Sequence, residues 1–168
     1  MVTAAIVAAC LLSGALPAGA GQGSAGSMPA PAPAETALGD ACALLTSAQV
    51  GAALGVKVGA GEHPVAAHTF MCGWADPKVP RSSAKKALLT LITERQFDFG
   101  KMEVPGVAKS VVSGVGDDAY SVVAGSVGTA LNVRRGDRYF QVKAGGSGLT
   151  AGQAQAIEKR LALAVLAR

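Results

Sequence analysis

The sequence predicts an α+β domain, with an antiparallel sheet of about five to six strands and two or three helices packed on one face. Several segments alternate apolar and polar residues, as half-buried strands do. Two others carry apolar residues a helical turn apart and follow a Ser or Thr that can cap a helix. Half of the 168 residues are apolar and 15% are charged, which is typical of a folded chain and not of a disordered one.

Residues 1–20 are predicted to form a cleaved signal peptide. The stretch from Ala4 to Leu16 is apolar and uncharged. It is shorter than the roughly 20 apolar residues that cross a bilayer. The small residues of 17–20 (PAGA) then suit signal peptidase. No Lys or Arg precedes the apolar run, which favours a translation start upstream of Met1.

Cys10 keeps a second interpretation of this segment open. Residues 7–10 (VAAC) fit the small-residue box that precedes a lipidated cysteine, which would anchor the chain to a membrane. Cleavage after Ala20 is favoured, because Leu11 and Leu12 are apolar where a lipoprotein tether is polar. Both interpretations predict an exported protein, periplasmic or extracellular.

Residues 21–38 are predicted to be a flexible linker, and residues 39–168 a single folded domain. Residues 21–34 (GQGSAGSMPAPAPA) have little to bury, and their alternating Ala and Pro favour an extended conformation. Such a spacer favours attachment of the domain to another envelope component.

The first half of the domain is expected to contain one clear helix and three strands. The helix covers Ser47–Leu54, because Thr46 or Ser47 can cap it and Gly55 can end it. The strands are expected at 56–58, 69–75 and 87–94, with a polar connection at 76–86 and a short helix at 95–102.

The second half is expected to end in a hairpin and a helix. Residues 104–116 are irregular and a strand covers 119–124, followed by strands at 129–135 and 138–144 that turn at Gly136-Asp137. The last helix begins near Thr150 or Gly152. Its inward residues are Ile157, Leu161 and Val165, and its outward residues are Glu158, Lys159 and Arg160. Strands with a helix in both halves suggest a duplicated βββα-like unit.

Cys42 and Cys72 are predicted to form a structural disulfide. Two cysteines in one small domain usually pair in an oxidising compartment. Closing a loop of about thirty residues stabilises a fold by roughly 3–4 kcal/mol in the chain-entropy view. A redox-active pair is the alternative, but it normally has Cys-x-x-Cys spacing.

Four motifs in order resemble a family of secreted or lipid-anchored bacterial domains of unknown function, the DUF 3558-type domains familiar from actinobacterial lipoproteins. The resemblance covers most of residues 39–168 and implies an exported domain with a disulfide. It carries no established catalytic residue. The matching motifs are 40–46 (DACALLT) with Val50 and 53–55 (ALG), 72–74 (CGW), 114–120 (GVGDDAY) and 131–137 (LNVRRGD), followed by a helix rich in Leu and Ala.

No local motif predicts catalysis or a cofactor. Residues 114–119 match a loose dinucleotide fingerprint, but a strand and not a helix is expected to follow. Asp117 and Asp118 are adjacent, so in extended structure they point to opposite faces and are interpreted as solvated turn residues. His63 and His68 are expected in a loop, where a metal site with Glu62 or Asp76 is not favoured. The prediction is therefore no catalytic residue, no metal and no cofactor.

Arg134, Arg135 and Arg138 cluster at the predicted hairpin tip and are a candidate binding surface. Arg135 also begins an Arg-Gly-Asp tripeptide, for which ordinary turn chemistry is the favoured interpretation. The arginines could extend a basic surface together with Arg81, Lys85 and Lys86, although solvated charge at loop ends is favoured.

The leading functional hypothesis is a non-catalytic envelope module that binds an envelope protein or a small ligand through the free sheet face or its loops. The net charge of +4 comes from scattered residues, so no nucleic acid partner is expected, and membrane contact is expected only through a lipid anchor. The alternative is a hydrolase-type enzyme with a dispersed site at His63, His68, Asp117 and Asp118. A purely structural surface protein is not distinguished from the first hypothesis.

Overall fold

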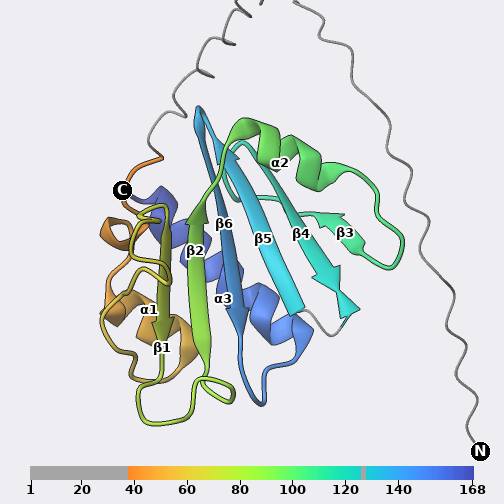
Figure 1. Cartoon of the computed structure of the whole chain (residues 1–168). Coiled ribbons are helices and arrows are strands. Elements are labelled where there is room, and N and C mark those ends of the chain that lie inside the picture. The colour runs from red at the N-terminus through yellow and green to blue at the C-terminus, as the bar shows by residue number, and fades with distance from the viewer. Residues whose placement is uncertain (1–37, 126–127) are drawn as a thin grey trace, which may run out of the picture. The chain divides into compact units, whose positions relative to one another are not determined.

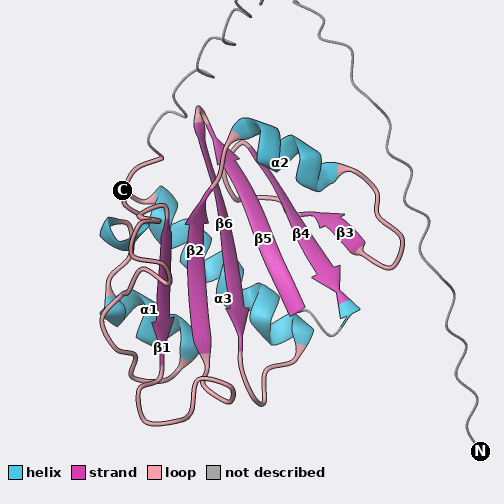
Figure 2. Cartoon of the chain, in the orientation of Figure 1, coloured by secondary structure: helices cyan, strands magenta, loops and turns pink. Residues whose placement is uncertain are grey.

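The computed structural model describes residues 38–125 and 128–168. They form one six-stranded antiparallel sheet with three α-helices packed on it, which confirms the predicted α+β class (Figures 1 and 2). The predicted signal peptide, Cys10 and nearly all of the predicted linker lie outside the described residues. Within the described ranges, no helix has the length and apolarity needed to cross a membrane.

The order of the strands across the sheet is β1-β2-β6-β5-β4-β3. All neighbouring strands are antiparallel. Two strands precede α2 and four follow it, so the two halves do not repeat a βββα unit. The elements are the 3-10 turn η1 (Ala41–Ala43), α1 (Ser47–Leu54), β1 (Met71–Ala75), β2 (Lys86–Leu91), α2 (Glu94–Lys101), β3 (Ala108–Val111), β4 (Asp118–Ala124), β5 (Gly128–Arg135), β6 (Arg138–Gly145) and α3 (Ala151–Leu166).

Each α-helix begins at a threonine that forms a capping box. Thr46, Thr93 and Thr150 accept a backbone N–H from the glutamine three residues later, and that glutamine side chain bonds the threonine N–H in return. Such a box satisfies two of the free N–H groups at a helix start. At the other end of α1, Gly55 has φ 68° and closes the helix, as predicted.

Two expectations about strands were wrong. Residues 56–58 are irregular, because the N–H of Val56 bonds back to Gly51 O and completes the end of α1. Residues 108–111 form the edge strand β3, where a wholly irregular segment was expected. Three of its four residues are exposed, including Val111 at 85%, so it has no alternation of buried and exposed residues to detect.

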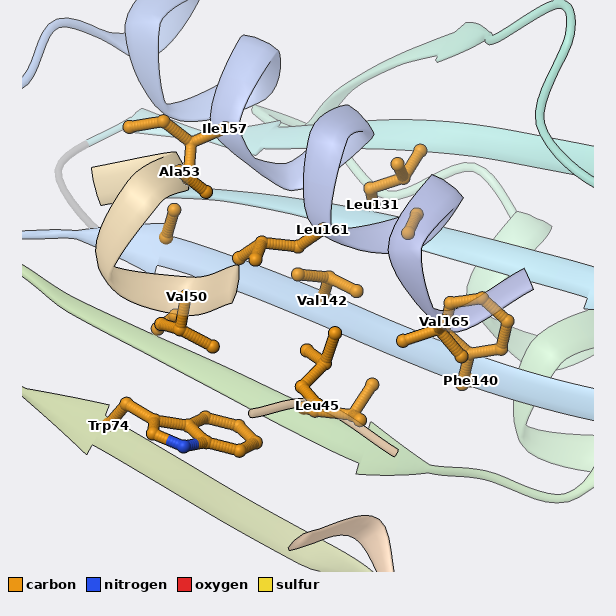
Figure 3. Packing of buried hydrophobic residues seen from close by; sticks show 14 of the residues in the cluster. Leu45, Val50, Ala53, Trp74, Leu131, Phe140, Val142, Ile157, Leu161 and Val165 are labelled. Atoms are coloured by element: carbon orange, nitrogen blue, oxygen red, sulfur yellow. The ribbon is translucent and has the colours of Figure 1, made fainter. Parts of the chain in front are cut away.

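Helices α1 and α3 cover one face of the sheet and enclose the main core. Figure 3 shows Val50 and Ala53 of α1 and Leu161 of α3 directed toward the strands. Trp74, Leu89 and Val142 from three adjacent strands are at most 2% exposed. Full burial of a large apolar side chain contributes roughly 1.5–3 kcal/mol, so this layer supplies much of the driving force for folding.

Helix α2 packs against the opposite face, which we call the open face. Phe97 is fully buried between two tyrosines of that face, with ring centroids 5.2 Å from Tyr120 and 5.6 Å from Tyr139. The Tyr120 hydroxyl donates to the Phe97 carbonyl at 2.8 Å. Because α2 crosses only one end of the sheet, the rest of the open face has no helix over it (Figure 1).

The Cys42–Cys72 disulfide is present, as predicted. It joins the start of the domain to β1, where Cys72 is fully buried beside Trp74. Gly61 passes so close that a Cβ there would lie 2.7 Å from Cys72 Sγ, so only glycine fits at this position.

The outward orientation expected for Glu158 was wrong. Its side chain is fully buried between α3 and the sheet, where Oε1 accepts Thr129 Oγ1 at 2.7 Å and the Ala144 N–H at 3.1 Å. Oε2 has no hydrogen-bond partner among the described residues. Burial raises the pKa of Glu158, and the bonds from Thr129 and Ala144 oppose that rise only in part.

We predict that Glu158→Gln raises the free energy of unfolding at pH 7, on the order of 1 kcal/mol. Glutamine keeps an acceptor for Thr129 and Ala144 without a buried charge. Because the pKa is raised in the folded state, wild type gains stability as the pH falls from 7 through that pKa toward the usual 4.5. Urea unfolding at several pH values should therefore give a difference that shrinks on acidification. The control Glu103→Gln changes an exposed carboxylate and should alter neither the free energy of unfolding at pH 7 nor its dependence on pH. An equal gain in both variants would contradict the role of the buried charge.

Candidate ligand groove on the open face

The four residues of the dispersed hydrolase site do not come together. His63 lies beside β1, where its Nδ1 donates to Met71 O at 2.8 Å, and His68 stacks on Phe70 with centroids 5.0 Å apart. Asp117 and Asp118 lie at the start of β4. Strands β1 and β4 are four intervals apart in the sheet, or about 19 Å at the usual spacing. The histidines and aspartates therefore cannot act on one substrate atom.

Both aspartates have structural partners, so their interpretation as merely solvated turn residues was incomplete. Asp117 Oδ2 accepts the Gly136 N–H at 2.7 Å and holds the tip of the β5–β6 hairpin. Asp118 Oδ2 lies 2.5 Å from Lys101 Nζ and ties the end of α2 to β4. The segment before β4 is a turn that leads into a strand, as predicted for residues 114–119.

His63 lies near Asp40 and not in a site with Glu62 or Asp76. Its Nε2 is 3.6 Å from Asp40 Oδ1, and its Nδ1 is 3.7 Å from Cys42 Sγ. The Cys42 sulfur belongs to the disulfide and is no thiolate ligand. Two ligands remain, fewer than the three or four protein ligands of typical zinc sites, so we assign this cluster no metal role.

The arginine cluster lies at the β5–β6 hairpin, which turns at Gly136-Asp137 as predicted. Arg135 pairs with Arg138 across the hairpin, and its Nε is 4.0 Å from Asp117 Oδ1. Lys86 pairs with Gly145 at the other end of β6. The hairpin arginines and the cations around Lys86 therefore do not form one basic surface.

A groove of about 440 Å³ lies on the open face below α2. Its floor is formed by β4, β5 and β6, and its wall by α2 and the segment that leads to β3. The wall carries three exposed apolar side chains: Phe99 is 72% exposed, Met102 59% and Val104 53%. Apolar residues of the floor include Val122 and Ala130.

Polar side chains also line this groove, Gln96 and Thr129 among them. Gln141 Nε2 donates to Asn132 Oδ1 at 2.8 Å across β5 and β6. Lys143 lies two residues further along β6 on the same face. Lys109 lines the far side, where its ammonium bonds the Met102 carbonyl.

Tyr120 also lines the groove, and its hydroxyl stays protonated at neutral pH. Burial raises its pKa to about 12, and the nearby carboxylates Asp98 and Asp118 contribute to the rise. Its hydroxyl proton is donated to the Phe97 carbonyl. Tyr120 therefore acts as a structural link between β4 and α2.

A larger hollow of about 1020 Å³ shares Lys143 with the groove. It extends around the end of the sheet where β2 and β5 begin and β1 and β6 end. Its charged lining residues are Glu62, Asp76, Arg81, Lys86 and Lys143. Arg81 is within 3.2 Å of Glu62, and the Asp76 carboxylate accepts the Lys78 N–H at 2.9 Å. Lys143 lines both hollows, whereas Lys86 lines the larger one only, and neither forms an ion pair within the described ranges.

Comparison with known proteins adds no functional assignment, since no protein-family model, curated protein or solved structure matches the chain. The sequence analysis did not predict the groove, and it assigned no role to the apolar residues of its wall. One signal was present: Phe97 and Phe99 are two residues apart in a helix, so both cannot face the sheet.

Proposed function

We propose that the protein is an exported, non-catalytic module that binds a small, largely apolar ligand in the open-face groove. The observation that carries the proposal is the row of exposed apolar side chains, Phe99, Met102 and Val104, along one wall of a groove. Soluble proteins rarely expose such apolar surface without a use for it.

The size and lining of the groove support a small ligand. Its volume falls within the roughly 300–1,000 Å³ of typical small-molecule sites. Such sites are mostly apolar with a few polar groups that fix orientation, which agrees with the Asn132–Gln141 pair and Lys143. The separation of the histidines from Asp117 and Asp118 favours binding over hydrolysis.

Export remains part of this proposal. The disulfide is compatible with an oxidising location, because disulfides persist outside the reducing cytoplasm. The apolar run at 4–16 and the small residues of 17–20 support a signal peptide. A linker at 21–38 would hold the groove at a distance from its attachment point, which would suit a module that exchanges ligands at the envelope.

We predict that Ala130→Trp blocks ligand binding, because the indole would fill the groove floor. The neutral fluorophore N-phenylnaphthylamine should bind the full chain saturably with an increase in fluorescence. Ala130→Trp should weaken its binding at least about tenfold, the effect of losing roughly 1.4 kcal/mol of contact. The control Val111→Trp, at an 85% exposed position on β3, should leave the affinity unchanged.

A second variant, Phe99→Ala, tests the groove independently in case Ala130→Trp misfolds. Phe99→Ala changes an exposed wall residue and should weaken binding severalfold while the thermal unfolding midpoint stays unchanged. Absence of saturable binding, or equal affinity in all four proteins, would contradict the proposed function.

A further inference from the structure

We infer that the ligand is a free, single-chain anionic amphiphile, such as a long-chain fatty acid. Its acid group would lie beside Lys143 and Lys86, and its chain would run along the groove toward Phe99, Met102 and Val104. This inference rests on the proposed function and names the chemistry of the ligand.

The charges in the groove favour an anion. The described residues that line it include no Asp or Glu, whereas Lys109 and Lys143 both do so. The Lys109 ammonium already bonds the Met102 carbonyl. Lys143 forms no ion pair or side-chain hydrogen bond within the described ranges. It is therefore a cation beside apolar surface without a direct ion pair, although its charge also acts on the buried Glu158 carboxyl across the sheet.

Lys86 strengthens the positive field at the same end of the groove. In the β2–β6 register, Lys86 pairs with Gly145 and Leu88 pairs with Lys143. Buried Ala87 and Leu89 face the core, so Lys86, Leu88 and Lys143 share the open face. Diagonal neighbours of this kind have Cα atoms roughly 7–8 Å apart, close enough for one carboxylate or phosphate to reach both ammonium groups.

Two acids, Glu62 and Asp76, line the adjoining hollow together with three cations. Glu62 pairs with Arg81, and Asp76 accepts the N–H of Lys78 in its own loop. Arg81, Lys86 and Lys143 thus outnumber the two carboxylates of that hollow, and an acidic headgroup would balance the excess positive charge. Gln141, two residues before Lys143 on the same strand face, adds an amide that can contact the headgroup.

The shape favours a single free chain over a membrane surface. A bilayer contacts a protein through a broad basic and apolar surface. Here the apolar residues form the wall of a hollow, Lys143 lines one end of it, and Lys86 lies on the neighbouring strand beside Lys143. A groove with an apolar wall and a cation at one end is complementary to an extended apolar chain with one acidic terminus.

The test compares dodecanoate, dodecanol and dodecylammonium below their micelle concentrations, by titration of the full chain in calorimetry and in amide NMR. Dodecanoate should bind at least about tenfold more tightly than dodecanol, and dodecylammonium more weakly than both. Its affinity should fall as salt rises, because the contact is between charges. Shifts should concentrate on residues of β5, β6 and α2.

Lys143→Met should remove most of the preference for dodecanoate over dodecanol, and Lys86→Met part of it. The control Lys57→Met changes an exposed lysine in the segment after α1 and should keep the full preference. Ala130→Trp should weaken binding of both ligands. All variants should be checked for an unchanged NMR fold pattern.

The outcomes separate this inference from the proposed function. If dodecanol binds as tightly as dodecanoate and Ala130→Trp blocks both, the groove binds ligands and the anionic headgroup is wrong. If neither ligand binds, or Ala130→Trp has no effect on either, the proposed function fails as well. If the chain instead sediments with phosphatidylglycerol vesicles in a Lys143-dependent way and takes up no free dodecanoate, a membrane surface replaces the free amphiphile.

Discussion

Reduction of the Cys42–Cys72 disulfide is expected to lower the free energy of unfolding by about 3–4 kcal/mol. The bond closes a loop with a sequence separation of 30 residues, and opening that loop raises the entropy of the unfolded chain. The loss is a large fraction of the roughly 5–15 kcal/mol typical of a domain. Denaturant unfolding with and without a reductant measures it directly.

Cys42→Ser with Cys72→Ser should reproduce the effect of the reductant. The reductant should then have no further effect on that double variant. An unfolding midpoint that does not move on complete reduction, with free thiols verified by alkylation, would show that the bond is not a major source of stability.

Phe97→Ala is expected to cost about 3–5 kcal/mol, the usual range for a fully buried phenylalanine. The ring is the apolar anchor of α2 on the open face, where it contacts Tyr120 and Tyr139. Lys101 Nζ lies 4.6 Å above its centroid and would lose that contact as well. Urea unfolding measures the loss, and hydrogen exchange should show α2 amides opening before those of β5 and β6.

Phe99→Ala provides the matched control, since it makes the same change two residues away in the same helix. That side chain is 72% exposed, so its removal should change the free energy of unfolding by no more than about 0.5 kcal/mol. Equal losses in the two variants would mean that α2 is not anchored through Phe97.

Elements with strong local signals could be predicted from the sequence. Thr46 and Gly55 marked both ends of α1, and the alternation of Phe140 and Val142 with polar neighbours marked β6. The cysteine pairing followed from the small number of cysteines. In each case the information lies within a few residues or in a rule of composition.

Features that depend on tertiary packing could not be predicted in this way. Glu158 follows Ile157 in α3, and helical spacing alone predicted that it faces solvent. In the structure it is buried between the helix and the sheet, where Thr129 and Ala144 donate hydrogen bonds to its carboxylate. The groove depends on where α2 crosses the sheet, and no local pattern fixes that position. Its lysines come from β2 and β6, which are far apart in the sequence and adjacent only in the sheet.

The placement of β6 has a consequence for the order in which the chain can fold. The β1–β2 hairpin joins the other strands only through β6, which is the last strand along the chain. During synthesis the chain leaves the ribosome amino end first. The β1–β2 hairpin therefore cannot pair with the rest of the sheet until residues 138–145 have left the ribosome as well. Pairings between such distant segments form slowly, which keeps the growing chain unfolded for longer. For the export proposed above, this delay would favour passage through a translocation pore that accepts only unfolded polypeptide.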